Sequence, residues 1–266
     1  MDLNLKDKVF LITGGGSGIG GAIVQQLAAE GAIPVVVDRD EKATALILDP
    51  LKAQGKTVHF CCMDLTSPEN CQQTVMEILK KFNRIDGLVN NAGVNDGIGL
   101  EHGSVEAFQN SIRLNLFHYY YMAHYCLPAL KKTRGTILNI ASKTGITGQG
   151  GTSGYAAAKG GQLALTREWA VELLKYSIRV NAIVPSEVMT PMYKRWINTF
   201  DNAEEKLKSI EVNIPYENRM TTAIEIANMA IFLLSDRASH ITGQQIFVDG
   251  GYVHLDRATS VLNKEH

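Results

Sequence analysis

The stretch VFLITGGGSGIG, residues 9–20, passes from an uninterrupted apolar run directly into a glycine-rich turn. Its apolar part, Val9–Thr13, predicts a buried strand, and the glycines predict a tight connection into a helix over Gly18–Glu30. Such a turn lets a ligand approach the backbone, and the helix N-terminus offers unpaired N–H groups with a partial positive charge. These features favour binding of a pyrophosphate, although for this motif alone a turn without a ligand remains an alternative.

The rest of the chain repeats this alternation of short apolar runs with helix-length amphipathic segments. Near-continuous apolar strands separated by helices are typical of a parallel sheet that helices cover on both faces. We therefore expect an α/β fold, a Rossmann-like doubly wound parallel sheet of seven strands. The predicted strands are Val9–Thr13, Pro34–Asp38, Thr57–Met63, Gly87–Asn90, Gly135–Ala141, Ile178–Val184 and Gln245–Val248, and the predicted helices are Gly18–Glu30, Glu41–Gln54, one that Pro68 opens, Ser104–Leu130, Gly154–Lys175 and Ala223–Leu234.

Length and composition fit one large domain. The 266 residues are 45% hydrophobic and 20% charged, with no linker, internal repeat or low-complexity tract. We expect a single dinucleotide-binding domain over residues 1–266. The region of residues 191–215 is weakly patterned and richer in charge and aromatics, so residues from about 189 to 215 are expected to form a flap over the substrate.

Charge, cysteines and histidines exclude several classes of protein. A net charge of -1 gives no electrostatic reason to expect nucleic acid or a membrane as partner, and no secretory signal or spanning run is found, so we expect a cytoplasmic protein. The four cysteines, of which Cys61 and Cys62 should point to opposite faces of a strand, are expected to be buried reduced thiols. The histidines show no pair at zinc-ligand spacing with a third ligand nearby, so we expect no catalytic metal.

The glycine spacing indicates a family. Thr13 followed by Gly14-x-x-x-Gly18-x-Gly20 matches the TGxxxGIG fingerprint of the short-chain dehydrogenase/reductase family, which the chain resembles over essentially its whole length. Residues 90–93, NNAG, match a second motif of that family. In the family's PGxxxT motif Ser186 replaces the glycine, which reduces backbone freedom there. The resemblance implies NAD(P)-dependent oxidoreductase activity and cofactor contacts from Gly14, Ser17, Gly18, Ile19, Gly20, Asp64, Leu65, Asn91, Ala92, Gly93, Pro185, Val188 and Thr190.

Asp38, at the end of the second predicted strand, bears on the choice of dinucleotide. A carboxylate there can accept hydrogen bonds from the adenosine ribose hydroxyls and would repel a 2′-phosphate, so NAD is favoured over NADP. Arg39 could instead fold over a phosphate, which keeps NADP possible. Asp64, in the adenine region, could equally shape a turn.

Tyr155 and Lys159 lie one helical turn apart, so the phenol and the ammonium share a helix face. A phenol with a pKa near ~10 does not readily accept a proton at neutral pH. We expect the ammonium and a cationic nicotinamide to lower this pKa by about 2–3 units, which requires roughly 3–4 kcal/mol. Tyr155 is then the predicted general base for alcohol oxidation, and Lys159 lowers its pKa and holds the nicotinamide ribose.

Two further residues complete the predicted catalytic set. Ser142 ends the fifth predicted strand and is expected to orient the reacting oxygen by a hydrogen bond. Asn115 matches the family's fourth catalytic residue, and the resemblance implies that it anchors a proton-relay water. Each residue alone has a structural explanation. Tyr155 and Lys159 could be an ordinary surface pair, Ser142 could form a turn, and Asn115 could bend a helix. Their joint occurrence after a dinucleotide turn favours catalysis.

The substrate is suggested by stretches outside the cofactor motifs. Residues 91–101, 186–192 and 249–257 resemble bacterial L-fucose dehydrogenases of this family, which oxidise the anomeric hydroxyl of the sugar to a lactone. A polyol also needs several fixed donors and acceptors, whereas an acyl or steroid pocket is mainly apolar. A 3-oxoacyl reductase, another alcohol dehydrogenase of the family and a non-catalytic dinucleotide sensor remain alternatives. The candidate substrate residues are Asn95, Asp96, Gln149, Glu187 and His254, with Trp196 as an apolar face for the sugar.

The segment FHYYYMAHYC, residues 117–126, bears on assembly. It is apolar or aromatic nearly all round, which is more than one buried helix face requires. We expect its second face to pack against another subunit in a homotetramer, with burial in the chain's own core as the alternative.

Overall fold

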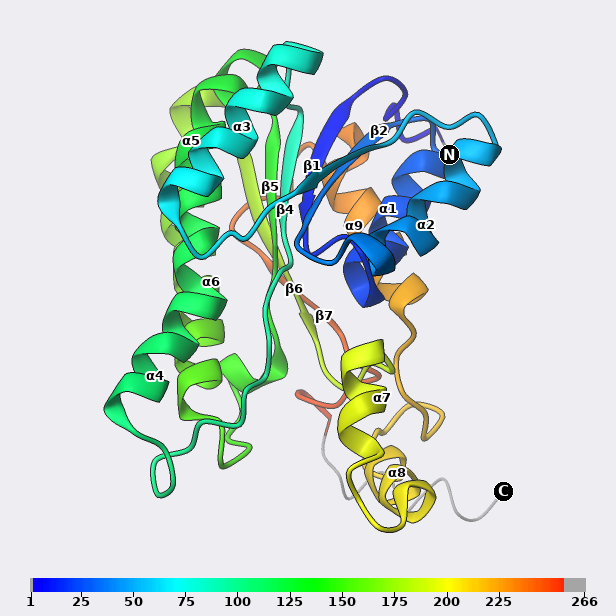
Figure 1. The fold of residues 1–266 in the computed structure, drawn as a ribbon, viewed down its shortest axis with the longest axis vertical. Helices are drawn as coiled ribbons and strands as arrows, with labels where there is room; N and C mark the ends of the chain where they lie inside the picture. The colour runs from blue at the N-terminus through cyan, green and yellow to red at the C-terminus, as the bar shows by residue number, and fades with distance from the viewer. Residues whose placement is uncertain (1, 256–266) are drawn as a thin grey trace.

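The computed structural model describes residues 2–255 and is built on one seven-stranded sheet (Figure 1). All neighbouring strands pair in parallel, in the order β3-β2-β1-β4-β5-β6-β7. The expected doubly wound α/β fold is confirmed. The chain order reverses between β1 and β4, and a ligand crevice is expected outside the carboxyl ends of the strands at such a point. The strands are β1 (Val9–Thr13), β2 (Ile33–Asp38), β3 (His59–Cys62), β4 (Gly87–Asn90), β5 (Thr136–Ile140), β6 (Arg179–Pro185) and β7 (Gln245–Val248).

Helices cover both faces of the sheet, and each face has its own apolar core (Figure 1). Alternate residues of β1 separate into the two cores: Phe10 and Ile12 belong to one, Val9 and Leu11 to the other. Because the strands are buried on both sides, their sequences are apolar without alternation. One face carries α1 (Gly18–Ala29), α2 (Glu41–Ala53) and α9 (Ala223–Leu234), and the other carries α3 (Pro68–Phe82), α5 (His118–Thr133) and α6 (Ser153–Glu172).

The helix predicted over Ser104–Leu130 is interrupted in the structure. It consists of α4 (Val105–Ile112), a π-helical turn over Arg113–Phe117, and α5. The prediction of one regular helix was wrong at this turn because contacts from distant segments determine the local backbone. The carbonyl of Asn115 accepts a hydrogen bond from Nε2 of Gln162 on α6.

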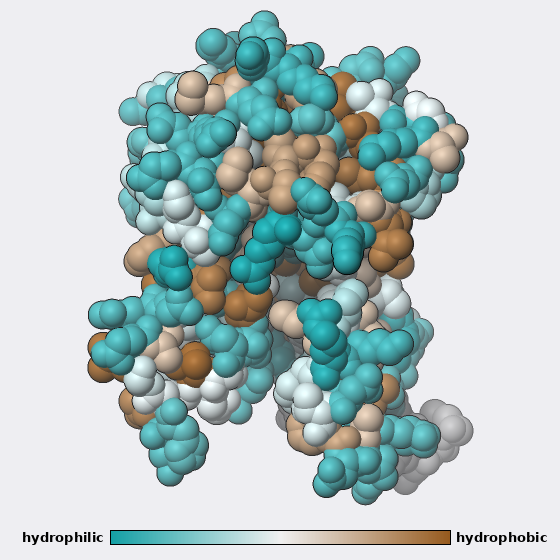
Figure 2. Space-filling model, viewed as in Figure 1, coloured by the Kyte–Doolittle hydropathy of each residue, from teal (hydrophilic) through white to brown (hydrophobic). Residues whose placement is uncertain are grey.

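Residues 191–211, where the sequence is weakly patterned, form two short helices. Thr190 caps α7 (Pro191–Ile197) by accepting from the N–H of Tyr193, and Asn202 caps α8 (Ala203–Glu211). Figure 2 shows the surface hollowed between these helices and the part of the chain around α4. This position suits the expected flap, whose action on a substrate stays a prediction.

The cysteines agree with the expectation of buried reduced thiols at three of their four positions. All four cysteines are free, and Cys61, Cys71 and Cys126 are buried as expected. Cys62 is exposed, which corrects the expectation, because β3 is an edge strand and the residue next to Cys61 points to its other face.

Among residues 2–255, no helix has both the length and the apolar character needed to span a membrane.

Candidate active site

The glycine turn between β1 and α1 leaves the start of α1 open to a ligand. Gly14 and Gly18 have positive φ values of 64° and 55°, and a Cβ added at Gly20 would collide with the carbonyl oxygen of Gly14. Ser17 is the N-cap of α1 but makes no capping hydrogen bond with its side chain, and the first turn, which includes Ile19, contains no acidic residue. The first N–H groups of α1 therefore have no side-chain acceptor and can bind an anion.

The loop after β4 holds this turn in place. Nδ2 of Asn91 donates to the carbonyl oxygens of Thr13 and Gly14, both at 3.0 Å. Oγ1 of Thr13 accepts from the N–H groups of Asn91 and Ala92, at 2.9 and 3.1 Å. The side chain of Asn91, predicted to contact the cofactor, thus positions the glycine turn.

Asp38 is fixed beside the glycine turn at the carboxyl end of β2. Its Oδ2 accepts from the N–H of Gly16 and its Oδ1 from the N–H of Asp40, both at 3.0 Å. Arg39 is exposed, and its charge contributes to lowering the pKa of Asp64. The chief cause of that lowering is the N–H of Thr66, which donates to Oδ1 of Asp64 at 2.9 Å, so this oxygen shapes a turn. Leu65 beside it is buried.

The residues present fit a dinucleotide. The uncapped N-terminus of α1 suits a pyrophosphate, and the carboxylate of Asp38 is held where ribose hydroxyls could donate to it. Thr190 lies across from this turn, since a Cβ added at Gly18 would be 3.3 Å from the Cβ of Thr190. The segment that begins at Thr190 therefore borders the same crevice.

The structure brings three of the predicted catalytic residues together below the end of β5. Ser142 and Tyr155 are hydrogen-bonded, and Nζ of Lys159 lies 5.4 Å from the centre of the Tyr155 ring. Nζ of Lys159 also donates to the carbonyl of Ile140 at 2.8 Å. Tyr155 and Lys159 share one face of α6, as their spacing predicted, and Ser142 reaches them from the turn that follows β5.

Asn115 joins this group through the loop after β4. Its Oδ1 accepts from the N–H of Val94 at 2.7 Å, and its Nδ2 donates to the carbonyl of Ser111. A Cβ added at Gly93 would lie 2.9 Å from Oδ1 of Asn115 and 4.0 Å from Nζ of Lys159. A π-helical turn often marks a functional position, and here it holds the buried Asn115 against the loop that contains Gly93, near the predicted catalytic lysine.

Burial determines the electrostatics of the pair. Burial raises the pKa of Tyr155 to about 12, and only its hydrogen bond with Ser142 acts in the opposite direction. Burial also lowers the pKa of Lys159 to about 7. In the cofactor-free protein burial thus disfavours both the phenolate of Tyr155 and the ammonium of Lys159, and the expected lowering of the Tyr155 pKa by the ammonium and a cationic nicotinamide together stays a prediction.

The segment after β6 accommodates Ser186, which stands where the family's PGxxxT motif has a glycine. Ser186 is not among the described residues with positive φ, so no glycine is required at this position. Its Oγ donates to the carbonyl of Asp249 at 3.2 Å, which connects the ends of β6 and β7. Pro185 pairs with Val248, and the buried Val188 accepts from the N–H of Thr190 at 2.8 Å.

The predicted substrate residues do not all reach the catalytic group. Asp96 accepts from Oγ of Ser111 at 3.0 Å, and its charge acts to raise the pKa of Tyr155, so it lies close by. Asn95 and Gln149 are exposed in neighbouring loops. Trp196 packs edge-to-face with Tyr193 and Phe200 on the α7 side, and His254 packs on Phe247 at 4.3 Å, while Asp256 and Arg257 of the third resemblance stretch lie outside the described residues.

Lys143 is a site residue that the sequence analysis missed. It forms an ion pair with Glu187, and the two side chains are only 8% and 15% exposed. Nζ of Lys143 also lies 3.7 Å from the centre of the Tyr252 ring. Lys143 directly follows Ser142 and Glu187 directly follows Ser186, so their positions after adjacent parallel strands were the available signal.

Comparisons with known proteins identify the family. The model described as "Enoyl-(Acyl carrier protein) reductase" matches residues 14–253. The chain belongs to the short-chain dehydrogenase/reductase family. It is therefore an NAD(P)-dependent oxidoreductase that acts on CH–OH groups.

Individual members of this family that resemble the chain act on different compounds. The 2,5-dichloro-2,5-cyclohexadiene-1,4-diol dehydrogenase of Sphingobium indicum is 36% identical over 255 residues, which cover 95% of this chain and 99% of the relative. The L-fucose dehydrogenase of Bos taurus is 34% identical over 92% of this chain and 88% of the relative. The solved structure of Cj0485 dehydrogenase is 49% identical in sequence and has a TM-score of 0.93. The match covers 97% of this chain and 98% of the chain in that structure.

Proposed function

We propose that this short-chain dehydrogenase/reductase oxidises L-fucose or a related aldose at the anomeric hydroxyl to the lactone, with NAD as the cofactor. The observation that carries the proposal is the buried ion pair of Lys143 and Glu187 beside Ser142. Removing two charges from water costs free energy, and a pocket for an acyl chain or a steroid gains nothing from such a pair. A polyhydroxy ligand can accept from the ammonium and donate to the carboxylate.

The catalytic residues supply the proton chemistry of this oxidation. Tyr155 takes the proton of the anomeric hydroxyl, and Ser142 holds the reacting oxygen by a hydrogen bond. When bound, the nicotinamide accepts the hydride from the anomeric carbon. Lys159 binds the ribose and favours the phenolate while it is charged. In the reverse direction Tyr155 returns the proton.

The preference for NAD is supported by Asp38. Its carboxylate is held by two backbone N–H groups, so it cannot easily turn away from a ribose bound beside the glycine turn. A 2′-phosphate at that position would meet a fixed negative charge. The exposed Arg39 next to it is the feature that would favour NADP.

A second candidate function is reduction of a 3-oxoacyl thioester. The exposed Lys194 and Arg195 on α7 favour it, because they could meet an acidic carrier protein at the edge of the crevice. A non-catalytic dinucleotide sensor is disfavoured, since such a protein would not need Ser142, Tyr155 and Lys159 in contact.

The deciding experiment is a panel of aldoses, simple alcohols and a 3-oxoacyl thioester, assayed with both dinucleotides. We expect reduction of NAD⁺ with L-fucose and stereochemically related pyranoses, at a higher kcat/KM than with NADP⁺. Absence of turnover across the aldoses, together with turnover of the thioester, would overturn the proposal.

A further inference from the structure

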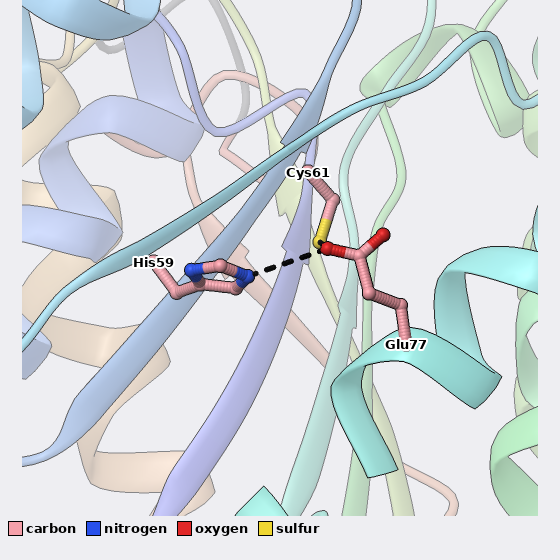
Figure 3. A group of neighbouring side chains, drawn as sticks. All are labelled: His59, Cys61 and Glu77. Carbon is pink, nitrogen blue, oxygen red and sulfur yellow. Dashed lines mark hydrogen bonds and ion pairs between the residues drawn. The ribbon is translucent and has the colours of Figure 1, made fainter. Parts of the chain in front are cut away.

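A second cluster of polar side chains lies at β3, the edge strand of the sheet, and it takes no part in the chemistry described above. His59 and Cys61 project from the same face of this strand because they are two residues apart. Glu77 reaches them from α3, as Figure 3 shows. The cluster thus combines an imidazole, a thiol and a carboxylate from two neighbouring elements.

The distances in this cluster match those within a metal centre. One donor atom of each residue lies within 4.8 Å of the other two. Nε2 of His59 is 3.6 Å and Sγ of Cys61 is 3.8 Å from Oε1 of Glu77. Ligand bonds of about 2.0–2.3 Å in a tetrahedral zinc site place the ligand atoms roughly 3.3–3.8 Å apart. Small side-chain movements are therefore enough to ligate a cation.

The environments of the donor atoms act in opposite directions at Cys61 and His59. Burial, together with Glu77, raises the pKa of the Cys61 thiol to about 12, so the thiolate forms only when a bound cation replaces its proton. Nε2 of His59 is buried, and Oε1 of Glu77, which faces it at 3.6 Å, lies beyond normal hydrogen-bond distance, so a cation between the two atoms would satisfy both. Burial and Lys81 lower the pKa of His59, while Glu77 acts to raise it, and the net lowering favours the neutral imidazole, the form that ligates. Cys61 is buried, whereas Glu77 is half exposed and leaves a path for a cation and a water to enter.

We propose that His59, Cys61 and Glu77 form a binding site for a divalent cation of the zinc class, with water as the fourth ligand. Nitrogen and sulfur donors favour such a metal over magnesium or calcium, which prefer oxygen ligands. The site is separate from the predicted catalytic group, and its role is to connect the edge strand to α3. Binding replaces the thiol proton of Cys61, which passes to solvent, and involves no change of oxidation state.

Lys81 is the charged residue that opposes this binding. Its Nζ lies 3.0 Å from Nδ1 of His59, and its charge would repel a cation at Nε2. Because Lys81 is exposed, its side chain can move into solvent when the metal binds. Removing this charge by Lys81→Met should therefore tighten binding, which a chance arrangement of side chains would not predict.

The test uses the full-length protein, freed of metal by a chelator and titrated with Co²⁺ as a spectroscopic probe. We expect one Co²⁺ per chain, a thiolate-to-cobalt charge-transfer absorption, and displacement of Co²⁺ by Zn²⁺. Cys61→Ser should abolish the absorption, and the matched control Cys62→Ser, which changes the exposed neighbour, should retain it. His59→Gln and Glu77→Gln should weaken binding by about tenfold or more.

Two results would overturn the proposal. One is a wild-type protein with an intact Cys61 thiol that shows no charge-transfer absorption on addition of Co²⁺. The other is equal Co²⁺ binding by the Cys61→Ser and Cys62→Ser variants. If Cys61→Ser alters folding in the absence of metal, the affinities of His59→Gln and Lys81→Met decide, since the first must fall and the second must rise. Dehydrogenase activity is a separate readout, so failure here leaves the proposed function unaffected.

Discussion

At the scale of single residues, the phenol of Tyr155 is the proposed general base, so turnover should depend on it. Tyr155→Phe keeps the ring and removes the atom that exchanges the proton with the substrate. We expect turnover to fall by about 10²–10⁴-fold, the usual contribution of general acid–base catalysis. NADH binding, measured by fluorescence titration, should be nearly unchanged. A variant that retained wild-type turnover would show that another group moves the proton.

The burial of Tyr155 gives the reaction a pH dependence with a definite sign. Oxidation needs the unprotonated phenol, and burial raises its pKa to about 12 in the cofactor-free protein. We expect kcat/KM for sugar oxidation to rise with pH by up to about tenfold per unit below the apparent pKa of the cofactor complex. Reduction, which needs the protonated phenol, should show no such rise. A flat profile for oxidation would contradict this assignment when hydride transfer limits the rate.

The pair of Lys143 and Glu187 should control sugar affinity. Glu187→Gln preserves shape but leaves the Lys143 ammonium without its countercharge, in surroundings where its side chain is 8% exposed. Losing one partner of such a buried pair typically costs about 2 kcal/mol or more, equivalent to roughly 30-fold. We expect KM for L-fucose to rise by this factor while NADH affinity stays unchanged. The control is Glu204→Gln, which breaks the exposed pair with Lys208 and should have no effect on KM.

At the scale of elements, the connection between β1 and α1 is expected to determine cofactor binding. A Cβ at Gly20 would collide with the carbonyl of Gly14 and would also lie 2.6 Å from Nδ2 of Asn91. Gly20→Ala should therefore distort the turn and weaken NAD⁺ binding by about tenfold or more, measured by calorimetry. Gly148→Ala is the matched control, because its added Cβ would meet no atom within 4 Å. Equal affinities in the two variants would contradict this role of the turn.

The same elements show what the sequence could and could not predict. The ends of β1, β4, β7 and α9 follow from apolar runs with clear boundary residues, and the structure has them as predicted. The order of Ser142, Tyr155 and Lys159 also follows from motifs, since each lies at a fixed place after a strand or on a helix face. The π-helical turn at Asn115 depends on Gln162 of a distant helix, which no local pattern records.

The pKa values and the Lys143–Glu187 pair were unpredictable for a related physical reason. A spacing places two residues on one face, but the depth at which they are buried depends on every element packed over them. Tyr155 and Lys159 share a face as predicted, yet burial determines the direction of both pKa shifts. Lys143 pairs with Glu187 because β5 and β6 are adjacent in the sheet, which the sequence alone did not establish.

At the scale of the whole molecule, one side carries apolar groups that the chain itself does not cover. On α5, Tyr119 and Met122 are fully buried, whereas Tyr120 is 52% exposed, and Phe117 in the preceding π-helical turn is 42% exposed. Tyr120 also contacts Trp169 of α6, so the two helices form one surface. The exposed apolar residues of this surface are Phe108, Phe117, Tyr120, Val171 and Leu174. Several large apolar side chains exposed on neighbouring helices are typical of an interface between proteins.

We propose that this surface forms a two-fold contact that buries the same residues in each copy, and that a second contact between the resulting pairs completes a homotetramer. Static light scattering should then give a mass about four times the 29.1 kDa of one chain. Tyr120→Glu should dissociate the assembly, because a carboxylate would be buried without a partner at a self-complementary contact. Leu46→Glu changes an exposed leucine on α2, away from this surface, and should leave the mass unchanged. A wild-type protein that scatters as a monomer, or a Tyr120→Glu variant with the wild-type mass, would place the subunit contact elsewhere or exclude it.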